Sequence, residues 1–188
     1  MHVEFSKRPD GGSLALIDRG DGTRWRLRSY DRTGTAPHDA VHLVGERALR
    51  LDRGLWGSIR AGALFDSLEL VDGTPRHDRR RRSDAVRRAN AEELRLAETV
   101  VGVLAQSLDR DGPATKAALD AAWGITRTGP SPYTAAQAAT AVAELRELRR
   151  RWRTLGPGET IPFAWLSEDL HTHSHARRRG RSQWVRRG

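Results

Sequence analysis

Residues 13–29, SLALIDRGDGTRWRLRS, decide the fold class of this chain. Apolar residues alternate with others in Leu14–Leu16 and again in Trp25–Leu27, a period of two that is typical of strands with one buried face. Arg19–Gly22 lies between them and is built from turn-forming residues. The stretch therefore predicts two antiparallel strands joined by a short turn.

The same period of two occurs at both ends of the chain. Val3 and Phe5 precede a second turn at 9–12, which extends the hairpin to a three-stranded antiparallel meander. Far downstream, alternating apolar residues in Ile161–Trp165 predict one more strand, and Pro162 favours a sheet edge because proline cannot donate a ladder hydrogen bond. We expect this strand to join the meander.

Between these strands, apolar residues recur at steps of three and four, which predicts helices. Thr134 followed by Gln137 matches a capping box and marks one helix start. The expected helices are 37–51, 55–70, 84–108, a shorter one through 119–123, and 134–155. The sequence thus predicts an α+β fold in which a small antiparallel sheet, the N-terminal meander plus a C-terminal edge strand, packs with about five helices.

A chain of 188 residues suits one core of ordinary size. We expect a single α+β domain over 1–167. Inside it, 76–83 is expected to be an exposed Arg-rich linker, because this stretch contains a run of four arginines and no apolar residue. Residues 168–188 are rich in histidine and arginine and have little to bury. They are predicted to form a disordered tail.

Most of the formal net charge of +9 belongs to the last eighteen residues of the chain. Residues 171–188 hold six arginines and no acidic residue, and without them the net charge falls to +3. Such a tail predicts a weak, salt-sensitive contact with nucleic acid or an acidic protein. Its alternating His171, His173 and His175 are expected to chelate metal only adventitiously.

Composition also bears on compartment and chemistry. The absence of cysteine excludes disulfides, thiol nucleophiles and Cys-type zinc sites, so any metal must be held by histidine and carboxylate. The N-terminus lacks the layout of a signal peptide, and no apolar run is long enough to span a bilayer. We expect a cytoplasmic protein without membrane contact.

One cluster of histidines and carboxylates, at the start of the predicted helix 37–51, suggests a metal-binding or catalytic site. His38, His42 and Glu46 follow one another at four-residue spacing, so each lies 40° around a helix from the last, and Asp39 falls within the same arc. His38, His42 and Glu46 are the predicted ligands of a divalent metal, possibly zinc. Asp39 and Glu46 are the predicted catalytic carboxylates, because a carboxylate left off the metal is a natural general base.

A purely structural interpretation of the cluster stays open. Asp39 would then favour the positive end of the helix dipole, and Glu46 would pair with Arg47, Arg50 or another neighbour.

The next helix bears on where a substrate would fit. Gly54, Gly57 and Gly62 weaken that helix and are expected to leave room for an unknown small-molecule substrate. Trp56 and Phe65 are predicted to line this space or to belong to the core.

His38-Asp39-Ala40-Val41-His42, followed by a glycine-containing turn, resembles the His-Asp-x-x-His signature of the coenzyme Q biosynthesis family, which is associated with zinc. The similarity covers about thirty residues. In that family a glutamate lies twelve residues beyond the second histidine, where this chain has Gly54. The layout as a whole, with Arg53–Gly57 and Leu155–Glu159, also resembles uncharacterised small proteins of GC-rich bacteria.

Two functions follow as hypotheses. The first is a small metal-dependent enzyme, of hydrolase or lyase type, with a His/carboxylate site at a helix start. The alternative is a non-enzymatic regulatory or interaction protein that binds nucleic acid or an acidic partner through its Arg-rich segments. Dinucleotide-binding, phosphate-loop and serine-elbow motifs are absent from the sequence.

Overall fold

The computed structural model describes residues 1–29 and 35–165. Five strands form one sheet in the order β4-β3-β2-β1-β5, and every neighbouring pair is antiparallel. The predicted meander and the predicted C-terminal edge strand are both present. The strands are β1 (His2–Lys7), β2 (Ser13–Asp18), β3 (Arg24–Ser29), β4 (Leu68–Asp72) and β5 (Thr160–Ala164).

The described residues also form six helices, which confirms the α+β class. The predicted capping box is present at the start of the longest helix, where Thr134 and Gln137 bond each other's backbone N–H groups. The helices are α1 (His38–Leu49), α2 (Leu55–Ala61), α3 (Arg79–Ala89), α4 (Ala91–Gln106), α5 (Gly112–Thr126) and α6 (Ala135–Thr154).

The side of β2 that faces the core differs from the prediction, which placed Leu14 and Leu16 on the buried side. Ala15 and Ile17 are buried, whereas Leu16 is 44% exposed. Residues 14–17 are all apolar, so the pattern in β2 alone does not fix which side faces inward. The neighbouring strands decide it, because Ile17 pairs with both Val3 and Trp25, which are buried.

The helix predicted over 55–70 is too long. It ends at Ala61, where Gly62 adopts a φ of +105° that terminates the helix, and residues 68–72 form β4. Leu64 and Leu68 are four residues apart, which fits a helix, but Leu68 and Leu70 also fit a strand. Pairing with β3 at the sheet edge settles this ambiguity in favour of the strand.

The Arg-rich segment and the long helix predicted after it are also arranged differently. Residues 79–82 are exposed, as expected, but they form the first turns of α3 instead of a linker. A break at Asn90 then separates α3 from α4. The Asn90 side chain is buried, accepts a hydrogen bond from Arg53 and donates one to Ser58, so contacts with α2 and the turn before it hold this corner.

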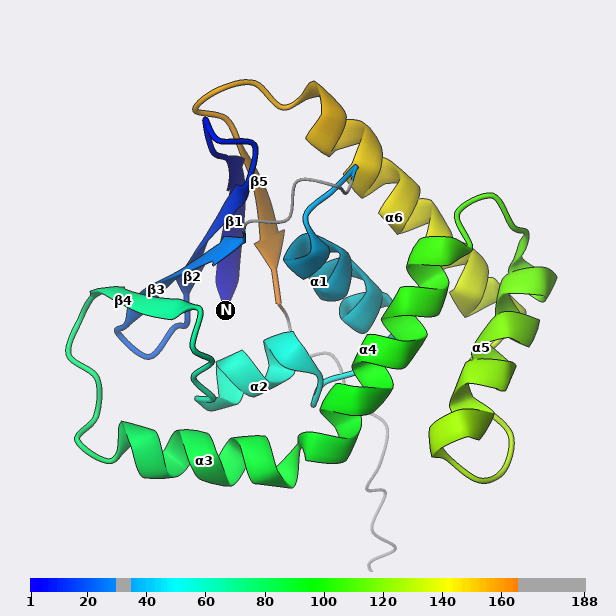
Figure 1. Ribbon diagram of the computed structural model, residues 1–188, viewed down its shortest axis with the longest axis horizontal. Coiled ribbons are helices and arrows are strands. Elements are labelled where there is room, and N and C mark those ends of the chain that lie inside the picture. Colours follow the sequence, from blue (N-terminus) through cyan, green and yellow to red (C-terminus); the bar gives the residue numbers. More distant parts are fainter. Residues whose placement is uncertain (30–34, 166–188) are drawn as a thin grey trace, which may run out of the picture.

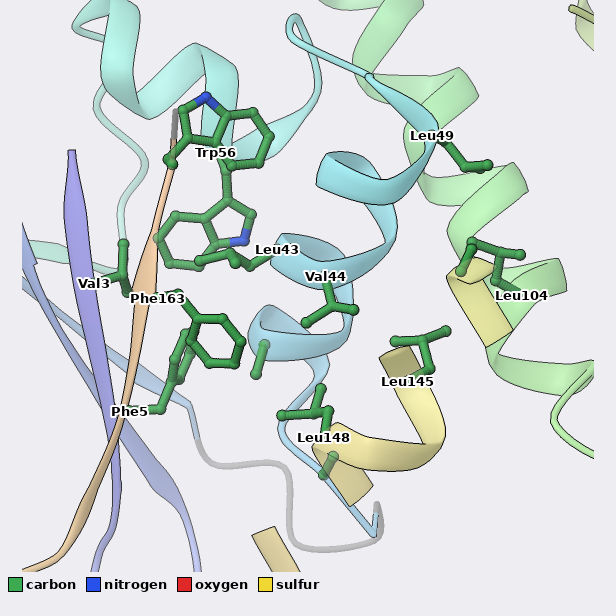
Figure 2. Packing of buried hydrophobic residues seen from close by; sticks show 14 of the residues in the cluster. Val3, Phe5, Leu43, Val44, Leu49, Trp56, Leu104, Leu145, Leu148 and Phe163 are labelled. Atoms are coloured by element: carbon green, nitrogen blue, oxygen red, sulfur yellow. The ribbon is translucent and has the colours of Figure 1, made fainter. Parts of the chain in front are cut away.

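Helix α1 lies at the centre of the molecule, between the sheet and helices α4 and α6 (Figure 1). Side chains from all three layers meet around it (Figure 2). Phe5 packs edge-on against Trp56 and Phe163, with ring centroids 5.7 and 5.9 Å apart. This central position places both faces of α1 against other elements, so its polar residues must also find partners.

Among the described residues, no helix combines the length and the hydropathy that a membrane-spanning segment needs. The tail predicted at 168–188 lies outside the described residues.

Candidate metal centre

Helix α1 runs from the surface into the core, so its polar residues His38, His42 and Glu46 are increasingly buried. The His38 side chain is 56% exposed, that of His42 is 2% exposed and that of Glu46 is fully buried. The helix starts directly after Pro37, whose carbonyl accepts the first helical hydrogen bond from Val41. The predicted common arc of His38, His42 and Glu46 is therefore present, but the three side chains lie at different depths.

The surface end of this arc meets a carboxylate from another helix. Glu98 of α4 places Oε2 at 3.3 Å from Nε2 of His42 and at 3.9 Å from Nε2 of His38. The two imidazole rings lie beside each other, with centroids 4.5 Å apart. One donor atom from each of these three side chains lies within 4.8 Å of the others, and this His38–His42–Glu98 group could hold a metal ion.

The buried end of the arc has a different role. Glu46 accepts a hydrogen bond on Oε1 from Nδ1 of His42, at 3.1 Å, when that nitrogen carries the proton. Its carboxylate also accepts backbone N–H groups from Leu55 and Trp56, each at 3.0 Å. Glu46 thus closes the N-terminus of α2, where Gly54 has no side chain to do so. Three hydrogen bonds within the protein therefore hold this carboxylate in place.

Two glycines allow these contacts. A Cβ added at Gly54 would lie 2.5 Å from the carboxyl carbon of Glu46, so only glycine leaves room for this carboxylate. A Cβ added at Gly45 would lie 3.0 Å from a methyl group of Val101. Because Gly45 and Val101 lie three residues after His42 and Glu98, their close contact brings α1 and α4 together beside the candidate centre.

Two carboxylates, Glu46 and Glu98, determine the charge of His42. Burial opposes protonation of His42, but its hydrogen bonds with Glu46 and Glu98 outweigh this and raise the pKa of His42 to about 9. The hydrogen bond with His42 lowers the pKa of Glu98. Without a metal, a positive imidazolium between two carboxylates is therefore the favoured state at neutral pH. A divalent cation at Nε2 of His42 would replace the proton beside Glu98, while the Nδ1 proton stays hydrogen-bonded to Glu46.

The structure separates the residues that the sequence grouped. His38 and His42 lie together as predicted, while Glu46 faces the other nitrogen of His42 and is not in the group of three. Asp39 is half-buried, and its backbone carbonyl accepts a hydrogen bond from the indole of Trp56 at 2.8 Å. The pairing of Glu46 with an arginine, considered as an alternative, is not found in the described residues.

Sequence reasoning missed Glu98. It lies on a helix that was expected, between the buried positions Leu96 and Val100, but it is 52 residues from Glu46 in sequence. A polar residue at the edge of an apolar helix face carries no signal of which helix it will meet. Only the packing of α4 on α1 brings this carboxylate to the two histidines.

Two of the three glycines predicted to leave room for a substrate, Gly54 and Gly57, do not open such a space. The Gly54 space is filled by Glu46, and a Cβ at Gly57 would lie 1.8 Å from the carbonyl oxygen of Asp52. Trp56 is fully buried in the core. A hollow of about 170 Å³ lies beside His38 instead. Its walls are mostly apolar and include Val41, and Arg149 also lines it.

Comparisons with models of known families, with curated protein sequences and with solved structures find no significant match for this chain.

Proposed function

We propose that this chain is a small metal-dependent enzyme, of hydrolase or lyase type, that binds a divalent ion through His38, His42 and Glu98. The observation that carries the proposal is the convergence of three donor atoms within 4.8 Å, two from α1 and one from α4. Zinc suits this donor set, because two imidazoles and a carboxylate are frequent zinc ligands in the absence of cysteine.

Two of the three distances between donor atoms are close to those around a tetrahedrally coordinated zinc ion. Zinc bonds to nitrogen and oxygen of about 2.0 to 2.2 Å imply donor atoms about 3.3 to 3.5 Å apart. The His42–Glu98 distance of 3.3 Å already fits, and the His38–Glu98 distance of 3.9 Å needs only a small side-chain movement. His38 and Glu98 are more than half exposed, so both side chains have the freedom to make it.

Glu46 would act on the metal through His42. Histidines that bind metals commonly donate their second ring N–H to a carboxylate, which fixes the tautomer and makes the ligating nitrogen more basic. The Nδ1 contact with Glu46 leaves the lone pair of Nε2 directed toward Glu98 and His38. We assign Glu46 as a positioning residue rather than a ligand, while the general-base role of Asp39 stays a prediction.

Three protein ligands leave a coordination position for water or substrate, which is the arrangement of catalytic rather than structural zinc sites. A bound ion would lower the pKa of that water and polarise a substrate oxygen. The hollow beside His38 would hold an apolar part of the substrate against Val41, with Arg149 available for an anionic group. These features favour hydrolytic or lyase chemistry.

The resemblance to the His-Asp-x-x-His signature points the same way. Position 54, where that family has its downstream glutamate, is glycine here, and the carboxylate of Glu46 fills the space beside it. We therefore propose that Glu46 supplies the carboxylate of this neighbourhood from within α1.

Zinc affinity of the full-length protein tests the proposal. The three tail histidines are first replaced (His171→Ala, His173→Ala, His175→Ala), so that adventitious chelation does not contribute. In this background we expect one zinc per chain, and His42→Ala and Glu98→Gln should each weaken zinc binding by more than the about 10- to 100-fold typical of lost outer partners. His77→Ala, at an exposed histidine outside the centre, is the matched control and should leave the affinity unchanged.

Glu46→Gln examines the positioning role separately. This variant keeps the size of the side chain, so we expect one zinc per chain but an affinity about 10 to 100 times lower. Substitution with cobalt then tests the open position, because its visible absorption should change when a small chelating ligand such as acetohydroxamate is added. Equal zinc binding by His42→Ala and His77→Ala, or no binding by the parent, would refute the proposal.

A further inference from the structure

A second hollow, of about 330 Å³, lies on a different part of the molecule. Its lining residues come from the β2–β3 turn, the end of α2 and the start of α3 with the segment before it. Figure 1 shows these elements on the β4 side of the sheet. Five arginines line it: Arg19, Arg60, Arg76, Arg79 and Arg82. No residue of the candidate metal centre contributes to it.

Two of these arginines have acidic partners. Arg19 bonds Asp21, with contacts of 2.6 and 2.9 Å, and also covers the ring of Trp25. Arg76 bonds Asp78 at 3.2 Å. Asp21 is the one acidic residue among the described residues that line the hollow, so the lining carries an excess of four positive charges.

The other three arginines reach the hollow without a carboxylate. Within the described part of the chain, the guanidinium groups of Arg60 and Arg79 have no hydrogen-bond or ion-pair partner, and that of Arg82 donates only to the carbonyl oxygen of Ala61, at 3.3 Å. Such convergence is unfavourable by itself, because like charges repel and each long side chain is free to turn into solvent. An anion in the hollow would remove this repulsion.

The backbone favours this arrangement of the arginines. Gly62 ends α2 with a φ of +105°, and a Cβ there would lie 3.1 Å from Nε of Arg82. Arg79 and Arg82 are three residues apart on α3 and therefore share one face of the helix. Arg60 reaches the hollow from the last turn of α2. The guanidinium groups thus approach from two separate elements.

We propose that this hollow binds the phosphate group of a small phosphorylated molecule. Guanidinium groups match the tetrahedral, multiply charged phosphate because each can donate two parallel hydrogen bonds. The hollow is of a size found for small-ligand pockets, and Trp25 and Leu64 give it apolar wall beside the arginines. It therefore has room for an organic group attached to the phosphate.

A small ligand fits this hollow better than a nucleic acid does. The arginines line one concave space, whereas nucleic acids are bound by basic stripes that follow the phosphates over many residues. Arg80 and Arg81, on the same helix, do not line the hollow. A nucleic acid would use these exposed side chains as much as Arg79, and this difference makes the two ligand classes distinguishable.

The test uses the full-length protein labelled with ¹⁵N and kept in a metal chelator, so that it is independent of the proposed metal centre. The indole N–H signal of Trp25, which lines the hollow, reports binding. We expect inorganic phosphate and ribose 5-phosphate to shift this signal saturably, with the ester binding more tightly, and ribose to leave it unchanged. The double variant Arg60→Gln, Arg79→Gln should lower both affinities about tenfold or more, because charge-assisted hydrogen bonds are lost.

Arg80→Gln is the matched control, since it removes the same charge from the neighbouring position of α3. It should change the affinities less than twofold, and thermal unfolding should show that all variants are folded. The proposal is overturned if phosphate causes no saturable shift of the Trp25 signal, or if Arg80→Gln weakens binding as much as the double variant Arg60→Gln, Arg79→Gln does. Binding of a single-stranded oligonucleotide without binding of ribose 5-phosphate would overturn it in favour of a nucleic-acid surface.

Discussion

His42 has a carboxylate at each of its ring nitrogens, Glu46 at Nδ1 and Glu98 at Nε2. Glu46 is fixed by backbone N–H groups and cannot turn away, whereas Glu98 is more than half exposed and can adjust. One rigid and one movable carboxylate around a buried imidazole suit a group that exchanges a proton for a metal ion. The imidazole nitrogen that meets Glu98 is available to a metal only after it has lost its proton.

This arrangement predicts how the stability of the metal-free protein depends on pH. The pKa of His42 is about 9 in the folded chain and near 6.5 when unfolded, so its protonation stabilises the fold fully below pH 6.5. As pH rises from 6.5 through 9, the unfolded chain loses this proton first and the contribution disappears. With chelator present, the free energy of unfolding should fall across this range, with a slope of at most about 1.4 kcal/mol per pH unit from this group.

Urea unfolding at several pH values measures this dependence. His42→Gln removes the titrating group, so its free energy of unfolding should change less over the same range. The same pH dependence in the variant and in the unmodified chain would show that His42 does not hold its proton through the carboxylates.

A second prediction at the residue scale concerns Gly54. Gly54→Ala places a methyl group 2.5 Å from the carboxyl carbon of Glu46, so we expect a loss of about 1 to 3 kcal/mol of stability and weaker zinc binding. Gly124→Ala, where a Cβ meets nothing within 4 Å in helix α5, should instead stabilise the protein by up to about 1 kcal/mol. Denaturant unfolding and zinc titration compare the two variants. Equal effects would mean that the Glu46 position does not depend on Gly54.

At the scale of elements, the centre depends on how closely α1 approaches α4. Gly45 lets the backbone of α1 meet Val101, and this contact lies one turn beyond the pair His42 and Glu98. The two helices are separated by 41 residues of the sequence and are different amphipathic segments. Gly45, a small residue where the two helices meet, is therefore as necessary for the candidate centre as the side chains that would bind the metal.

Gly45→Leu tests this contact. The larger side chain must push α4 away, so we expect about 1 to 3 kcal/mol of destabilisation and a lower zinc affinity, because Glu98 moves away from His42. Gly102→Leu carries the same change next to Val101, where a Cβ has open space, and should preserve zinc binding. Unchanged zinc affinity in a folded Gly45→Leu protein would show that α4 does not supply a ligand.

At the scale of the whole molecule, the proposed ligands come together only in the folded state. His38 and His42 lie on α1. Glu98 lies on α4, which follows β4 and α3 in the sequence. An ion that binds this folded arrangement must stabilise the fold, by about 2.7 kcal/mol when its free concentration is 100 times the dissociation constant. Figure 1 shows both helices in the middle of the molecule, so this gain should apply to global unfolding.

Thermal unfolding with and without zinc measures this gain. Zinc should raise the midpoint of the full-length chain that carries the three tail substitutions, and chelator should reverse the shift. His42→Ala and Glu98→Gln should reduce the shift, whereas His77→Ala should not. A shift that persists in both ligand variants would place the zinc elsewhere on the chain.

The sequence by itself determined the elements whose signals are local. The meander in 1–29, the edge strand at 160–164, the capping box at Thr134 and the shared arc of His38 and His42 follow from side-chain periodicity and turn chemistry, which act over a few residues. The tertiary structure decided the rest. The inward face of β2 depends on its partner strands, β4 depends on pairing with β3, and Asn90 splits a predicted helix through contacts with α2 and its preceding turn. Glu98 joins the two histidines only because α4 packs on α1, since a helix carries no local record of the surface that it will meet.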